Sequence, residues 1–335
     1  MTEVRVGDLA QGFLFRRQAV QLRTELSARG QELSTGRAAD LTDRLSGDTA
    51  RLAALDREVA LAATLRRNQA QAANRSAAMQ AALGRVQSAT EPLATTLRSA
   101  AAGGLAGELA AAGSAARGAF EDTVGALNQS TAGRSLFAGA ATTGPALAGA
   151  DAMLDTLRAE IGAETEAAGV AQIVEDWFAP GGGFDSSGYL GADSPASPVP
   201  LGGGDQAALD IRADAPALRQ VLAASALATL AADAALNLPE DTVRALFDTA
   251  AEGLGSAGPQ LIGLRADLGA EEARIERAGA RIEASAGGAR RARASLIEVD
   301  GYEAATRMEA LSQKLESLYA VTARLSRLTL LETIR

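Results

Sequence analysis

Residues 302–335 read YEAATRMEALSQKLESLYAVTARLSRLTLLETIR, and this stretch sets the architecture. Apolar side chains recur in it at spacings of 3, 4, 3, 7 and 3 residues. The members of this seam are Met308, Leu311, Leu315, Leu318, Leu325 and Leu328. Such spacing places them on one side of an α-helix, in the pattern of a heptad coiled coil. A helix with one apolar seam is marginal alone in water, so a second helix has to cover it.

The helical pattern begins earlier, at about Gly258. Four apolar residues in the first part of this region lie seven positions apart, and they are Ile275, Ile282, Ala289 and Leu296. The spacing extends the predicted seam, with weak points expected at Gly287-Gly288 and at Gly301, because glycine disfavours helix.

The other end of the chain, residues 9–65, is also predicted to be helical. Its apolar positions are Leu22, Leu26, Leu33, Leu41, Leu45, Leu52, Leu55 and Val59. They form one stripe at helical spacing, with charged residues elsewhere. Ser34-Thr35-Gly36 is an expected interruption, since glycine costs a helix about 1 kcal/mol relative to alanine.

The two terminal stripes can cover each other. Closing a longer loop adds only about 0.6 kcal/mol per doubling of its length, so pairing between distant segments is feasible. The residues alone are equally compatible with two unrelated core helices of a globular bundle.

The segments between the ends contain further helices and irregular stretches. Helices are expected over 66–101, with Pro92 in a first turn or at a kink, and over 105–131 after a break at Gly103-Gly104. The stretch GRSLFAGAATTGPALAG, residues 133–149, predicts a short β-hairpin because glycine and proline recur at short intervals.

The remaining middle, residues 151–255, is expected to be a small α+β domain. A helical stretch over 151–178 should break near Gly162 and Gly169, and 179–204 should be irregular. A short strand at 207–211 and helices near 215–236 and 239–254 follow. The apolar run from Val221 to Leu238 is interrupted by Asp233 and is too short and alanine-rich for a membrane span.

Charge is distributed unevenly along the chain. The net charge is −9, and residues 151–255 alone carry 4 basic and 17 acidic side chains. Residues 1–150 carry 16 basic and 13 acidic side chains, and residues 256–335 carry 12 and 11. The acidic middle therefore predicts a solvated outer surface. The basic cluster Arg290, Arg291 and Arg293 favours a solvated face or ion pairs between subunits over nucleic-acid binding.

Composition argues against an enzyme. The chain has no Cys and no His, which removes thiol and imidazole catalysts and the commonest metal ligands. The glycine triplets at 181–183 and 202–204 are interpreted as turns, because neither lies in a phosphate-binding motif. The carboxylates Glu240-Asp241 fit the first turn of a helix after Pro239. We expect no catalytic residue, no cofactor and no metal.

Three stretches resemble a known family. GDLAQGFLFRRQAVQLRTELSARGQELSTGRAADLTDRLSGDTARLAALDREV, residues 7–59, is similar to the N-terminal helix of flagellins and flagellin-like hook-associated proteins, including the ELSTG turn. ALNQSTAGRSLFAGA, residues 126–140, resembles the segment in which a family helix ends and GR-x-LFAG opens a hairpin. Residues 302–335 resemble the C-terminal helix, most closely that of the hook–filament junction members.

The resemblance implies a structural component of the bacterial flagellum, located outside the cell. It implies self-assembly with other axial proteins, type III export without a cleaved signal, and a chaperone on the C-terminal helix, but no nucleic-acid or membrane partner. Met1–Asp8 accordingly lacks the basic and apolar regions of a signal peptide. A subunit at the hook–filament junction is the first interpretation and a filament flagellin is the alternative. A cytoplasmic coiled-coil scaffold that shares only the pattern is the second alternative.

The predicted fold is mainly α, with long antiparallel terminal helices in a coiled-coil bundle, a short β-hairpin and the small α+β middle. We expect a terminal domain of residues 1–60 and 290–335, a helical rod of 61–150 and 256–289 with its hairpin at 133–149, and an outward-facing acidic domain of 151–255. The predicted assembly interface is Leu22, Leu26, Leu33, Leu41, Leu45, Leu52, Leu55, Met308, Leu311, Leu315, Leu318, Leu325 and Leu328.

Overall fold

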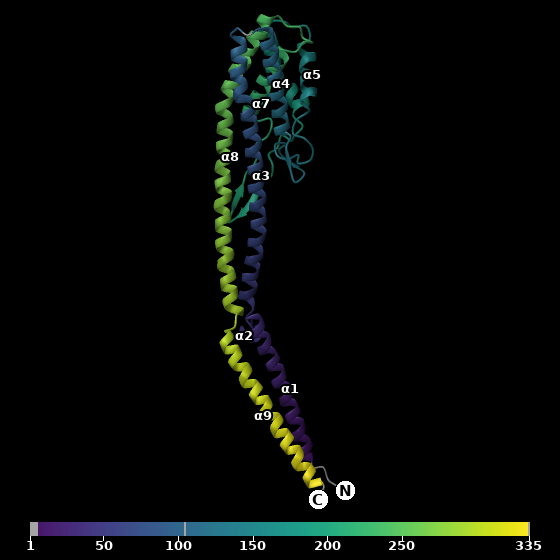
Figure 1. The fold of residues 1–335 in the computed structure, drawn as a ribbon, viewed down its shortest axis with the longest axis vertical. Helices are drawn as coiled ribbons and strands as arrows, with labels where there is room; N and C mark the ends of the chain where they lie inside the picture. The colour runs from purple at the N-terminus through teal and green to yellow at the C-terminus, as the bar shows by residue number, and fades with distance from the viewer. Residues whose placement is uncertain (1–5, 104, 334–335) are drawn as a thin grey trace. The chain divides into compact units, whose positions relative to one another are not determined.

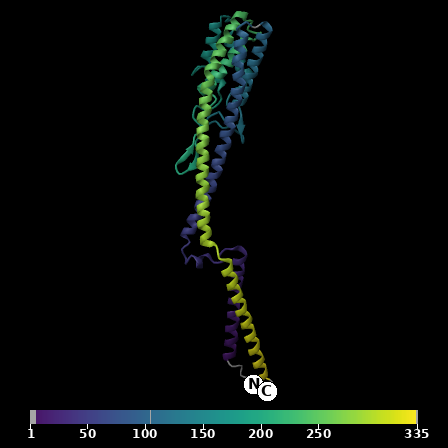
Figure 2. The same ribbon diagram turned by 60° about the vertical axis from the view of Figure 1, so that its left-hand side comes forward.

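The computed structural model describes residues 6–103 and 105–333, with side chains described for 10–103 and 105–325. The protein is 74% helical, with two short antiparallel hairpins and long terminal helices that pack together (Figures 1 and 2). The predicted mainly α fold with paired terminal helices is therefore confirmed.

Contacts divide the chain into two units. One combines residues up to 63 with those from 284 onward, and the other comprises residues 64–283. The finer division into three domains stays a prediction.

The first unit is built around a pair of helices. Its elements are α1 (Val6–Thr35), α2 (Leu41–Arg44), the first turns of α3 (Ala50–Ala101), the last turns of α8 (Glu240–Ile297), and α9 (Gly301–Thr333). Helices α1 and α9 lie side by side along their lengths (Figures 1 and 2). They run antiparallel, because the end of α1 and the start of α9 meet in one bridge between Arg37 and Glu298.

The helix expected over residues 9–65 is broken twice. The first break falls at the predicted place: α1 ends at Thr35, and Gly36 adopts φ of 67° and donates its N–H to the Glu32 carbonyl at 2.7 Å. This is the left-handed helix end that glycine adopts without a steric penalty. The second break, at Ser46-Gly47 before α3, was not predicted, and both of its residues have positive φ.

Of the two weak points expected in the C-terminal helix, Gly287-Gly288 does not break it, whereas the break that occurs ends directly before Gly301. Helix α8 continues through Gly287-Gly288, where the neighbouring Ala286 and Ala289 are buried and their packing offsets the low helix propensity of glycine. The break lies at residues 298–300, and Asp300 then accepts the N–H of Tyr302 at 2.8 Å and caps α9. Of the seam in α8, Ile275, Ile282 and Ala289 are buried and Leu296 is half-buried.

The second unit packs several helices around α7. Its helical elements are α3 from residue 64, α4 (Ala106–Leu127), α5 (Ala150–Ile161), α6 (Ala167–Phe178), the π-helical turn η1 (Phe184–Gly188), α7 (Pro216–Ala231), and α8 as far as residue 283. Helix α7 contacts α4, α5 and α6 and is buried along nearly its whole length. A helix of alanine and leucine on every side is suited to such a core position. In the described part of the chain, no helix combines the length and hydrophobicity needed to cross a bilayer.

Three local predictions about this unit need correction. Gly162 does end α5, but Gly169 lies inside α6. The second helix near 239–254 is the start of the much longer α8, which contains Pro259 in its interior. Pro92 likewise lies deep inside α3 and not in its first turn, while the alternative of a kink at Pro92 stays a prediction. Packing along a long helix can offset the low helix propensity of a single glycine or proline. From the local sequence, such residues are interpreted as helix ends.

The two hairpins are short. Strands β1 (Ser130–Thr131) and β2 (Arg134–Ser135) pair antiparallel around Ala132-Gly133. Both turn residues have positive φ, which matches the twist of tight hairpins. The last paired residue of this hairpin is Ser135. Most of the segment predicted to form the hairpin, residues 133–149, therefore lies after the paired strands.

Strands β3 (Val199–Gly202) and β4 (Asp205–Ala207) form the second hairpin. The glycine triplet 202–204 makes its turn, in agreement with the interpretation from sequence. The strand expected at 207–211 is β4, shifted toward the N-terminus.

Candidate assembly interface

The paired helices α1 and α9 carry the centre of the predicted interface. Leu22 and Leu26 of α1 are half-buried. The same intermediate burial holds on α9 for Met308, Leu311, Leu315 and Leu318. Packing of one helix on the other therefore leaves part of each of these apolar side chains in contact with water.

The rest of the predicted set is distributed over other elements. Leu33 and Leu325 are exposed, at 41% and 37%. Leu52 is buried in α3 and Leu55 is half-buried there, while Leu41 and Leu45 are half-buried in and just after α2. The side chain of Leu328 lies outside the described residues. The breaks at residues 36–40 and 45–49 divide the N-terminal stripe, so it does not form one continuous surface.

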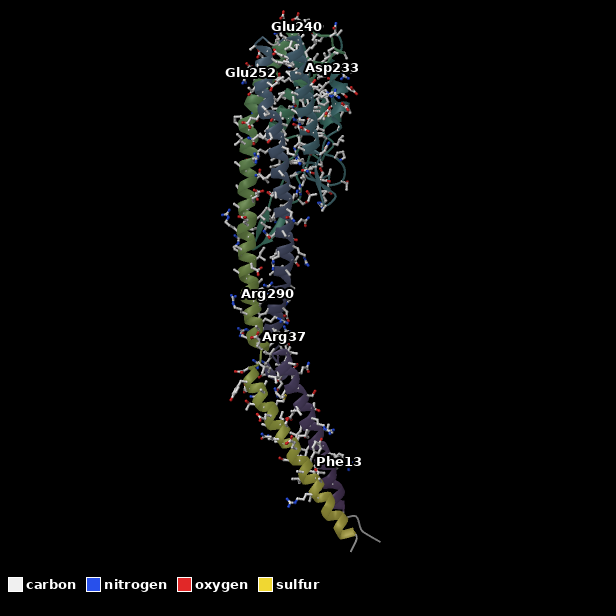
Figure 3. The ribbon with its side chains drawn as sticks, viewed as in Figure 1. Phe13, Arg37, Asp233, Glu240, Glu252 and Arg290 are labelled. Carbon is white, nitrogen blue, oxygen red and sulfur yellow. The ribbon has the colours of Figure 1, made fainter. Side chains whose placement is uncertain are left out.

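A second set of apolar side chains, on the outer surface of α1, is absent from the predicted interface. Phe13, Leu14 and Val20 are 63%, 61% and 62% exposed, and Phe13 lies on α1 in Figure 3. Phe13 and Val20 also line a hollow together with Arg16 and Arg17. Sequence offered one signal for this surface: the run Phe13-Leu14-Phe15 is too wide for one apolar stripe.

Helix α9 adds exposed apolar groups of its own. Tyr319 and Val321 are 41% and 48% exposed. The guanidinium of Arg23 on α1 lies 5.6 Å from the centre of the Tyr319 ring, a cation–π contact that joins the two helices. The helix pair thus has defined cross-contacts and still presents apolar surface to solvent.

Main-chain bonds fasten the end of the pair at residues 36–44 and 296–299. The Ala38 N–H donates to the Ile297 carbonyl at 2.8 Å, and the Val299 N–H donates to the Gly36 carbonyl at 3.1 Å. Arg44 donates through Nε to the Leu296 carbonyl at 2.8 Å and through a terminal nitrogen to the Glu298 carbonyl. Carbonyls at the end of a helix have no partner within that helix, so Arg44 acts as a cap for α8.

Glu32 is the buried ionisable group of this joint. Its side chain accepts the N–H of Ala39 at 3.1 Å and pairs with Arg29 at 2.5 Å, and the residue is only 4% exposed. Burial acts to raise the pKa of Glu32, but these hydrogen bonds and the charges of Arg29 and Arg307 outweigh it and hold the pKa below its usual value. Sequence reasoning recognised the ELSTG turn and missed the role of its carboxylate.

Other charged residues have structural partners. Arg293 pairs with Asp56 at 2.5 Å. Glu240 and Asp241 lie in the first turn of α8, as expected. Their negative charges interact favourably there with the positive end of the helix dipole. Among the described residues, no group of three or more acidic side chains is arranged to hold a metal ion.

The fold thus defines a mainly helical protein whose two chain ends form an antiparallel pair with exposed apolar groups. Residues 252–333, which comprise most of α8 and all of α9, match the model of the bacterial flagellin C-terminal helical region. The match supports the identification of the chain as a flagellin-family protein and, in function, as a structural subunit of the bacterial flagellum. That family is structural and its members assemble with themselves and with other flagellar axial proteins. Comparison with curated proteins gives no significant match.

Proposed function

We propose that this protein is the flagellin-like subunit at the junction of hook and filament. In this proposal it assembles through the faces of α1 and α9. The observation that carries it is the large exposure of Phe13, Leu14 and Val20 on α1, a helix already paired with α9. Side chains of this kind gain about 25 cal/mol for each Å² of apolar area removed from water. Neighbouring copies supply that cover in a tubular assembly.

The half-buried residues act in the same way. The seam members Leu22 and Leu26 on α1, and Met308 to Leu318 on α9, each keep apolar area that a neighbouring subunit can bury. Helices whose stripes are incompletely covered depend on packing for their order. Assembly and ordering of the terminal pair are therefore coupled in this proposal.

The test of assembly uses variants that leave the fold intact. Phe13→Gln with Val20→Gln should abolish self-assembly, measured by sedimentation, while circular dichroism stays unchanged. Leu105→Gln is the matched control, because Leu105 is 75% exposed but lies in the second unit. Equal assembly of the double variant and the control would refute the proposal.

Truncation gives a second test. Removal of residues 302–335 takes away all of α9 except Gly301 and should leave a soluble protein that cannot be incorporated into flagella. If the truncated protein still supports motility, the paired-helix mechanism is wrong.

The assignment to the junction rests on the similarity of residues 302–335 to the C-terminal helix of junction proteins. Immunogold labelling should find the protein at the distal end of the hook, in a few copies per flagellum. Labelling along the entire filament would instead make it a filament flagellin. Confinement to the cytoplasm would indicate a coiled-coil scaffold and refute both.

Export completes the proposal. We expect the chain to leave the cell unfolded through the flagellar type III apparatus, without cleavage of a signal, and with a chaperone on the seam of α9. A pull-down with residues 301–333 should capture that chaperone, and replacement of Leu311 and Leu315 by Gln should abolish capture.

A further inference from the structure

The second unit contains a pair of arginines that have no acidic partner among the described residues. Arg75 on α3 is half-buried, and its one described contact is a long hydrogen bond of 3.4 Å from a terminal nitrogen to the Leu136 carbonyl. Its Nε is buried without a hydrogen-bond partner. Within the described ranges, neither Arg75 nor Arg134 forms an ion pair.

The hairpin β1–β2 brings these groups together. Arg134 lies in β2, two residues before the carbonyl that Arg75 contacts, and it is exposed. The adjacent Ser135 is 4% exposed and buries a hydroxyl without a partner. Burial lowers the pKa of Arg75, and the nearby positive charge of Arg134 lowers it further. A partly buried cation without a counter-charge favours the approach of an anion.

The first half of α8 offers the complementary charge. Asp241, Asp248 and Glu252 are separated by seven and four residues, which places them on one face of the helix. All three are exposed, and none forms an ion pair with a described residue. Figure 3 shows Glu252 on this part of α8. We call these three residues the acidic stripe.

The acidic stripe cannot neutralise the arginines of its own chain. Ser76, next to Arg75, donates to Glu272 of α8 at 3.0 Å, so the arginine site lies at the level of residue 272. Twenty residues of helix separate that level from Glu252, a rise of about 30 Å. Screening limits exposed charges to about 10 Å in ordinary salt. The two patches of one chain are therefore too far apart to pair with each other.

We propose that Arg75 and Arg134 of one copy bind the acidic stripe of a second copy of this chain. Because the two patches differ, the contact is heterologous and joins copies head to tail. The inference rests on the proposed assembly function and assigns it a specific electrostatic contact. Complementary charges across an interface help to fix its register.

Charge reversal tests the contact. Arg134→Glu should raise the concentration needed for half-maximal assembly about tenfold, since each 1.4 kcal/mol of interface energy is one factor of ten. Asp248→Arg with Glu252→Arg in the same chain should restore assembly. Arg277→Glu is the matched control, because Arg277 is exposed on α8 and bonds only to its own helix, at the Ala273 carbonyl.

Cross-linking provides an independent measurement. The chain has no native cysteine, so Arg134→Cys combined with Glu252→Cys should yield a ladder of disulfide-linked oligomers under oxidation. Arg277→Cys combined with Glu252→Cys should yield none.

The outcomes separate the two proposals. If the unmodified chain never assembles, the proposed function fails and this contact fails with it. If the unmodified chain assembles, but Arg134→Glu assembles equally well and no ladder forms, only the contact between the arginines and the acidic stripe is refuted.

Discussion

Replacement of Glu32 by Gln removes the charge from the joint at the end of α1 and keeps the shape of the side chain. The amide oxygen of Gln can still accept the N–H of Ala39, but it loses the ionic part of the contact with Arg29 and the attraction of Arg307. Hydrogen bonds to charged groups contribute about 1.5–3 kcal/mol and neutral ones about 1 kcal/mol. The substitution should therefore weaken the joint by about 1–2 kcal/mol.

Hydrogen exchange measures this loss locally. The amides of Ala38 and Val299 bond across the joint to the carbonyls of Ile297 and Gly36, so they exchange when the joint opens. A loss of 1–2 kcal/mol corresponds to about 5- to 30-fold faster exchange. Glu25→Gln is the control: Glu25 is exposed on the same helix and has no ion pair with a described residue.

Acid should abolish the difference. The folded pKa of Glu32 lies below the ordinary value of 4.5, so its ionised form stabilises the folded joint. That contribution is complete above the unfolded pKa and is lost as the pH falls through the folded pKa. Wild type and Glu32→Gln should then exchange alike in acid, after correction for intrinsic rates. Equal exchange of Glu32→Gln and Glu25→Gln at neutral pH, or a difference that persists in acid, would refute the reasoning.

Three further substitutions test the second unit. Gly183→Ala should lower the free energy of unfolding by about 1–3 kcal/mol or more, because its new Cβ would lie 2.0 Å from Nε1 of Trp177. Thermal unfolding can be followed by the fluorescence of this single tryptophan. An unchanged free energy of unfolding would refute the predicted clash. Gly258→Ala should stabilise by about 0.5–1 kcal/mol, since a Cβ there meets nothing within 4 Å inside α8, and calorimetry that shows a lower melting temperature would refute this. Burial, together with the charge of Asp214, raises the pKa of Tyr189 to about 12. The neutral phenol therefore stabilises the fold fully at pH values below the unfolded pKa near 10. This stabilisation is lost as the pH rises toward the folded pKa of about 12. Tyr189→Phe should therefore resist alkaline unfolding better than wild type in pH titrations followed by circular dichroism.

The helical class followed from spacing, whereas the pairing of the chain ends followed from spacing together with the resemblance to flagellins, because spacing alone left two unrelated core helices equally possible. The seam from Met308 to Leu318 is half-buried against α1, as its heptad pattern predicted, and α1 ends at the ELSTG turn. Such features are local: the period of apolar residues and the backbone preference of Gly36 act within a few residues.

Other features could not be read in this way. The break at Ser46-Gly47 and the unbroken path of α8 through Gly287-Gly288 depend on what each segment packs against. Phe13, Leu14 and Val20 form an exposed surface because α9 does not cover them, and this depends on how the two helices pack. Burial is a property of the whole fold, and an apolar residue in a sequence does not state which of its sides is covered.

The sequence by itself thus determined that an amphipathic helix lies at each end of the chain. It also determined that no Cys or His is present for catalysis. Tertiary structure decided where those helices break, how Glu32 and Arg44 fasten their joint, and which cations of the described residues lack an acidic partner. The physical reason is the range of the forces. Helix propensity is settled between neighbours in the chain, whereas burial and ion pairing are settled between residues that only the folded chain brings together.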